Sequence, residues 1–101
     1  MTNKFFFVAV DDSTKEQRDA FTISMRGATA IGFWHQTETA WLVVDASGAL
    51  TSEALRRQVT AFMPEAAVIV VQATPIDWAT VAPQAAHEWL HDFLSPMKWR
   101  P

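Results

Sequence analysis

The chain has no cysteine and no tyrosine among its 101 residues. The lack of cysteine excludes disulfide frameworks and thiolate metal sites, and it fits a reducing compartment, so we expect a cytoplasmic protein. Only eight residues are Lys or Arg, and the formal net charge is −3. The strongly basic surface on which non-specific binding to a phosphate backbone depends is therefore not expected.

Glycine and long apolar stretches are also scarce. Of the three glycines, Gly27, Gly32 and Gly48, no two have the spacing of a phosphate-binding loop or a nucleophile elbow. No apolar stretch approaches the length of a membrane span, and the N-terminus lacks the pattern of a secretory leader, so no membrane partner is expected. The length fits one domain that covers residues 1–101.

Aromatic residues, in contrast, are plentiful. Five tryptophans and seven phenylalanines occur in this short chain, and half of all residues are hydrophobic. This is more aromatic surface than one small core can cover, which predicts self-association as a homodimer.

The most informative stretch is the apolar run Phe5–Val10, which ends at Asp11 and Asp12. Six apolar residues without alternation predict a strand that is covered on both faces. Ser13 and Glu16 then have the spacing of a capping box, which predicts that a helix begins with Ser13 as its N-cap. Gly27 is expected to end this helix in a left-handed conformation.

The remaining pattern completes a simple order of elements. Residues 28–36 and 40–44 are expected to pair as an antiparallel hairpin, and a helix capped at Thr51 should end at Pro64. Residues 66–71 form a second β-branched apolar run, and Pro83 suits the start of a last helix. The order predicts an α+β, ferredoxin-like βαββαβ sandwich with the first and third strands central and an extra C-terminal helix.

The chain also resembles the small ferredoxin-like proteins of the CRISPR adaptation machinery, and especially their SinR-like relatives outside CRISPR loci. The resemblance covers most of the chain and is carried by the stretches Val8–Asp11, Gly32–His35, Ala40–Val43, Thr51–Arg56, Trp78–Ala79 and Glu88–Leu90.

This resemblance implies a homodimer with a nucleic-acid-associated or scaffold role. Some family members are divalent-metal-dependent nucleases that use an Asp at the end of the first strand of each protomer, and by position that residue is Asp11. The resemblance thus implies Asp11 as catalytic residue and metal ligand, with Mg²⁺ or Mn²⁺ as the cation. Val10 stands where an aromatic residue commonly precedes this Asp. The residues alone allow a simpler interpretation, in which Asp11 and Asp12 only begin a helix.

A second candidate site is the stretch His87-Glu88-Trp89-Leu90-His91, a literal H-E-x-x-H. On a helix, His87 and His91 lie one turn apart and suit Zn²⁺, with Glu88 as general base of a small zinc hydrolase. The third protein ligand that a catalytic zinc needs has no recognised position. The alternative is a pair of histidines beside the apolar stripe of an amphipathic helix.

Two weaker features leave further hypotheses open. Trp34 and His35 suit either a stacking platform for a base or a sheet interface, and His35 is the polar group expected of a dimeric α+β-barrel enzyme with a small ligand. The alternative to any catalysis is a plain protein-interaction dimer. Arg56, Arg57, Lys98 and Arg100 suit a modest basic patch, although a solvated helix face and a frayed tail explain them equally well.

Overall fold

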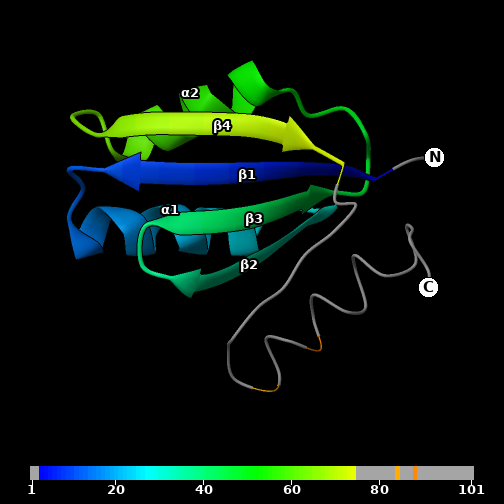
Figure 1. Ribbon diagram of the computed structural model, residues 1–101, viewed down its shortest axis with the longest axis horizontal. Helices are drawn as coiled ribbons and strands as arrows, with labels where there is room; N and C mark the ends of the chain where they lie inside the picture. Colours follow the sequence, from blue (N-terminus) through cyan, green and yellow to red (C-terminus); the bar gives the residue numbers. More distant parts are fainter. Residues whose placement is uncertain (1–2, 75–83, 85–87, 89–101) are drawn as a thin grey trace.

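The computed structural model describes residues 3–74 together with Gln84 and Glu88. Within this part of the chain, strands and helices follow one another in the order that the sequence predicts (Figure 1). The elements are β1 (Lys4–Asp11), α1 (Lys15–Arg26), β2 (Ile31–Thr37), β3 (Ala40–Asp45), α2 (Ser52–Phe62) and β4 (Ala67–Ala73).

The four strands form one antiparallel sheet in the order β2-β3-β1-β4. Both helices lie on the same side of this sheet, behind it in Figure 1. The predicted central position of the first and third strands is confirmed. The result is a small α+β arrangement of one sheet and two helices, which is compatible with a ferredoxin-like fold.

The core lies between the sheet and the helices. Alternate residues of β1 point to this side because successive side chains of a strand face opposite ways. Phe21 of α1 packs edge-on against Trp41 of β3, with ring centroids 5.1 Å apart and an interplanar angle of 88°. The buried side chains of this core cluster are Phe6, Val8, Val10, Phe21, Met25, Trp41, Val43, Leu55, Val59 and Met63.

The start of α1 differs by one residue from the sequence prediction. The N-cap is Thr14, whose hydroxyl accepts from the amide of Gln17 at 3.1 Å, and the Gln17 side chain accepts from the amide of Thr14. The predicted cap at Ser13 is therefore wrong. The box is shifted because Gln17 closes it as well as a glutamate does, and Ser13 has another partner, described below.

The end of α1 differs as well. Gly27 is the C-cap, but it has φ −85° and ψ −6°, which is right-handed. The predicted left-handed conformation at Gly27 is wrong, and positive φ occurs instead at Ala30, at 70°. The reversal of the chain is thus completed three residues later, directly before β2.

The second helix and the hairpin follow the prediction more closely. Thr51 caps α2 by accepting from the amide of Ala54 at 3.1 Å, and the helix ends at Phe62, just before Pro64. The hairpin between β2 and β3 turns at Glu38 and Thr39, and its register shifts between Trp34 and Thr37. This irregularity places a bulge on β2, an outer strand of the sheet.

The predicted last helix and the H-E-x-x-H stretch lie outside the described residues, apart from Gln84 and Glu88. Both residues are helical and exposed, and Gln84 Nε2 donates to Glu88 Oε2 at 2.9 Å. Within the described part of the chain, no helix combines the length and apolar character needed to cross a membrane.

Candidate functional site

Asp11 is the last residue of β1 and is exposed. The strand β1 ends at the left in Figure 1, where it leads into the turn before α1. The Asp11 side chain belongs to the sheet face opposite the helices, because Val10, its neighbour, points into the core. Asp11 is thus an exposed carboxylate at the end of a central strand.

The turn after Asp11 is shaped by the carboxylate itself. Asp11 Oδ1 accepts from the amide of Asp12 at 3.0 Å, and Asp12 has a positive φ of 61°. Aspartate tolerates this conformation better than most residues do. Among the described residues, the Asp11 side chain makes no other hydrogen bond or ion pair. One carboxylate oxygen thus supports the turn, and the other remains able to face an external group.

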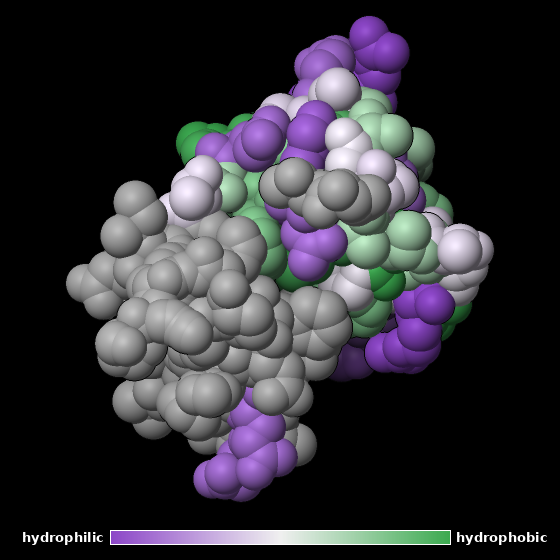
Figure 2. All heavy atoms as spheres, turned by 90° about the vertical axis from the view of Figure 1, so that its right-hand side faces the viewer, coloured by the Kyte–Doolittle hydropathy of each residue, from purple (hydrophilic) through white to green (hydrophobic). Residues whose placement is uncertain are grey.

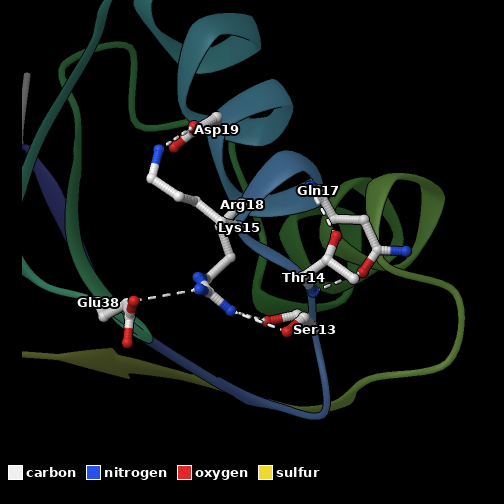
Figure 3. Close-up of polar contacts among 7 residues, drawn as sticks. All are labelled: Ser13, Thr14, Lys15, Gln17, Arg18, Asp19 and Glu38. Carbon is white, nitrogen blue, oxygen red and sulfur yellow. Dashed lines mark hydrogen bonds and ion pairs between the residues drawn. The ribbon is translucent and has the colours of Figure 1, made fainter.

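The side chain of Arg18, on α1, holds the turn after Asp11 in place through contacts with Ser13 (Figure 3). Its Nη1 donates to the carbonyl oxygen and to the hydroxyl of Ser13, both at 2.9 Å, while its Nη2 lies 3.3 Å from Glu38 Oε2. The Arg18 side chain is only 11% exposed, whereas that of Glu38 is 76% exposed. Arg18 therefore connects the turn after Asp11 to the hairpin turn between β2 and β3.

A second contact joins the same two turns. The amide of Val10 donates to the carbonyl of Thr39 at 2.9 Å, so the hairpin turn lies directly beside the end of β1. Sequence reasoning missed Arg18, because an arginine within an amphipathic helix is normally assigned to the solvated face. Its position beside the stripe residue Phe21 is the only signal that the sequence offers.

A shallow depression of about 260 Å³ adjoins Asp11. It is bordered by the last residues of β1 and the first residues of β4, and all except Asp11 are apolar: Ala9, Val10, Ala67, Val68 and Ile69. Ala9 and Ala67 are small, which is why the sheet surface is low here. The arrangement suits contact with a flat or protruding partner better than enclosure of a small ligand.

The sheet face opposite α1 and α2 is apolar, and its β1 side chains become smaller from Phe7 to Ala9. We call it the helix-free face because neither of these two helices lies on it. Phe7 pairs with Leu42 on one side and Val71 on the other, whereas two residues further on Ala9 pairs with Ala40 and Ile69. Phe7, Ile69 and Val71 are 46%, 55% and 45% exposed. We call these three residues the exposed strip. Phe5 and Val44, on the same face at the other end of the sheet, are each 2% exposed.

The structure places His35 against the core instead of in a cleft. Its ring stacks on Trp41 with centroids 4.3 Å apart and an interplanar angle of 8°, and its Nδ1 lies 2.8 Å from the carbonyl oxygen of Ala40. A carbonyl only accepts, so Nδ1 carries the proton in this contact. Trp34 lies opposite Leu42 and points to the other face, so the two residues form no joint platform.

Sequence reasoning also missed Asp45, at the end of β3. It is 1% exposed, and its carboxylate accepts from the amide and hydroxyl of Ser47 at 3.0 and 2.7 Å and from the amide of Leu50 at 2.8 Å. Burial alone would raise its pKa, but the hydrogen bonds from Ser47, Leu50 and Ala49 outweigh burial and hold the pKa below its usual range. The detectable signal was the spacing of Asp45 and Ser47, which is typical of an Asx turn.

Asp45 organises the loop before α2 and does not form part of a site at the surface. This end of the sheet faces the viewer in Figure 2, where hydrophilic and hydrophobic side chains are interspersed over the coloured surface. The exposed strip lies on the helix-free face of the sheet instead.

The other candidates are not brought together with Asp11. Arg56 and Arg57 lie on α2, where both contact Glu53, at 2.7 and 3.0 Å. This supports the interpretation of a solvated helix face for these two residues. His87, His91, Lys98 and Arg100 lie outside the described residues. Within residues 3–74, together with positions 84 and 88, no three His, Asp or Glu side chains gather in a way that would hold a metal ion.

Comparison with known proteins adds no relative: no family model, no curated protein and no solved structure matches the chain.

Proposed function

We propose that the chain is a homodimeric module with a ferredoxin-like fold, of the type found in CRISPR-adaptation proteins and their SinR-like relatives. Its role is that of a nucleic-acid-associated scaffold with weak metal-dependent nuclease activity at Asp11. The observation that carries this proposal is the position of an exposed Asp11 at the end of the apolar, helix-free face.

The dimer is argued from the exposed strip. Phe7, Ile69 and Val71 are large apolar side chains on adjacent strands, about half exposed and on the same face. Burial of such side chains is favourable by about 25 cal/mol per Å² of apolar surface. A second copy that faces the first through this strip buries the same residues on both sides, as a two-fold interface requires.

The taper of the face determines which ends of two facing sheets approach most closely. At Phe7, large side chains hold the sheets apart, whereas Ala9, Ala40 and Ala67 are small and only Ile69, opposite Ala9, protrudes in the rows of β1, β3 and β4 nearest Asp11. A two-fold axis near this end would place the two Asp11 carboxylates opposite each other. Two facing carboxylates repel, and a cation or a proton relieves that repulsion.

The donor set fits a hard divalent cation. Each protomer offers one exposed carboxylate with an oxygen that the turn does not use, and Mg²⁺ or Mn²⁺ binds through one or two carboxylates together with water. Such a cation supplies neutralisation of the charge on a phosphodiester and activation of water. Asp11 would hold the cation, while the backbone amide of Asp12 and the Arg18 side chain fix the turn that carries this carboxylate.

The experiment compares wild type with Asp11→Asn, using Asp12→Asn as the matched control. We expect Mg²⁺ or Mn²⁺ to raise the Tm of wild type and of the Asp12 variant, but not that of Asp11→Asn. Any metal-dependent cleavage of RNA or DNA should disappear in Asp11→Asn only. Equal metal responses in all three proteins would contradict the nuclease role and leave a non-catalytic interaction dimer as the function.

A further inference from the structure

The outer edge of β4 is a surface separate from the helix-free face, and its backbone N–H and C=O groups can pair with another strand. β4 pairs with β1 over seven consecutive residues, from Ala67 opposite Asp11 to Ala73 opposite Phe5, without a shift of register. Within the described part of the chain, β4 has no strand on its other side. In Figure 1 this edge forms the upper border of the sheet.

The composition of β4 lacks the usual protection of an edge strand. Its sequence is Ala-Val-Ile-Val-Val-Gln-Ala, which contains no charge and no proline. Natural sheets commonly protect their edges with charged side chains, proline or bulges, because an unpaired row of backbone N–H and C=O groups can pair with another chain. A regular, uncharged, β-branched edge of seven residues is therefore open to strand addition.

The opposite edge of the same sheet is protected. β2 carries a bulge between Trp34 and Thr37, and its ladder with β3 is interrupted there. Bulges bend an edge strand and terminate pairing. Of the two outer strands, only β4 thus presents a continuous ladder for a further strand.

We propose that β4 pairs antiparallel with β4 of a second copy. The strand carries no charge, so two copies bring no like charges together. Pairing over the full length centres on Val70 and sets Ile69 beside the partner's Val71. The two-fold axis of an antiparallel pair is normal to the sheet, so the helix-free faces of both copies lie on the same side.

Two features favour a second copy as the occupant. Ile69 and Val71 are 55% and 45% exposed, and this pairing joins them to the same residues of the other copy in one continuous apolar surface. The protected β2 edge also closes the assembly at two copies, since a second open edge would allow growth into a filament. This contact is separate from the face contact under "Proposed function", and use of both would give a tetramer.

The experiment uses proline in adjacent positions of β4, Ile69→Pro and Val70→Pro. Successive residues of an antiparallel strand direct their N–H groups to opposite sides, so one variant removes a ladder bond to β1 and the other only an outward N–H. The amide of Val10 donates toward the hairpin, so Ala9 and Ile69 bond each other across the ladder and the outward N–H is that of Val70. Ile69 also belongs to the exposed strip, so the test variant is Val70→Pro, and thermal melts show whether it stays folded. Its mass, measured by light scattering at the concentration used for wild type, should be half of the wild-type mass.

The variant Phe7→Lys separates this contact from the face contact, because Phe7 lies on β1 and takes no part in the edge pairing. If Phe7→Lys halves the mass and the folded proline variant keeps it, the edge proposal is overturned and the face dimer stands. If only the proline variant halves the mass, the edge stands and the face dimer fails. A monomeric wild type overturns both.

Hydrogen exchange of wild type gives a second measurement, which applies even if neither proline variant folds. The outward amides of β4 should become protected as protein concentration rises, while the amides of α1 should not change with concentration. Exchange in β4 that is independent of concentration overturns the edge proposal.

Discussion

The indole Nε1 of Trp41 donates a hydrogen bond of 3.1 Å to the hydroxyl of Thr22. That hydroxyl in turn donates to the carbonyl of Arg18 at 2.9 Å. Trp41 is 1% exposed and lies on a central strand, so water cannot readily replace Thr22 as the partner of its N–H group. A polar chain thus connects β3 to α1 within an otherwise apolar core.

Thr22→Val keeps the shape of this side chain but removes the acceptor. We expect the free energy of unfolding to fall by about 1–3 kcal/mol, because the indole N–H remains buried without a partner. Urea denaturation followed by circular dichroism measures the difference. Thr22→Ser, which keeps the hydroxyl, should lose less, and an equal loss in both variants would show that the methyl group matters instead of the hydrogen bond.

Asp45 should make stability dependent on pH at the acidic end. Its folded pKa is lowered, so its contribution is complete above the ordinary aspartate pKa of about 3.9 and is lost as pH falls through the folded pKa. Asp45→Asn should lower the free energy of unfolding at pH 7 by about 2 kcal/mol, because hydrogen bonds to a charged acceptor are lost.

The measurement is a series of urea denaturations from pH 7 downward. The gap between wild type and Asp45→Asn should narrow as the solution becomes more acidic than pH 4, since protonation removes the same charge from wild type. Asp12→Asn, at an exposed turn residue, serves as the control for loss of a carboxylate. A gap that stays constant with pH would mean that Asp45 acts only through packing.

Arg18 should matter more than the exposed carboxylate that it contacts. Arg18→Met keeps an apolar stem but removes the contacts with Ser13 and Glu38, and we expect a loss of about 1–3 kcal/mol with faster hydrogen exchange at the amide of Val10. Glu38→Gln should change stability little, because the Glu38 side chain is 76% exposed. Equal losses in the two variants would contradict a role for the contacts with Ser13.

The N-cap of α1 offers a comparison of adjacent hydroxyls. Thr14→Ala should cost about 1 kcal/mol, because the amide of Gln17 loses its acceptor. Ser13→Ala removes only the hydroxyl contact of Arg18, whose second bond to the Ser13 carbonyl remains. Thermal melts of the two variants rank the two positions by their contribution to stability. A larger fall in Tm for Ser13→Ala than for Thr14→Ala would identify Ser13 as the N-cap.

The element order was predictable because the apolar periods are distinct. The unbroken run Phe5–Val10 indicated a central strand, and the stripe Leu55, Val59, Phe62 and Met63 indicated one apolar face of a helix. These residues are buried as expected, apart from the half-buried Ala9 and Phe62 and the exposed Phe7. The position of Asp11 at the end of β1 also followed from the sequence. These features depend on residues that are close together in the chain, so the pattern of the sequence alone predicts them.

The features that were predicted wrongly or missed depend on competition between adjacent side chains or on contacts between residues far apart in the chain. Ser13 and Thr14 are both good caps, and the choice fell to Thr14 because Gln17 closes its box while Arg18 engages Ser13. Arg18 also contacts Glu38, which lies far along the chain in the hairpin turn between β2 and β3. No pattern within one helix specifies such a partner.

The place of β1 in the sheet has a consequence for synthesis of the protein. β1 is the first strand of the described chain to leave the ribosome, and β4, which lies directly beside it, is the last. Until residues 67–73 emerge, one side of Phe5–Val10 has no strand to pair with, although its other neighbour, β3, is already available. Nascent chains with an unpaired apolar strand are prone to aggregate, so Phe5–Val10 is the segment at risk until β4 has been synthesised.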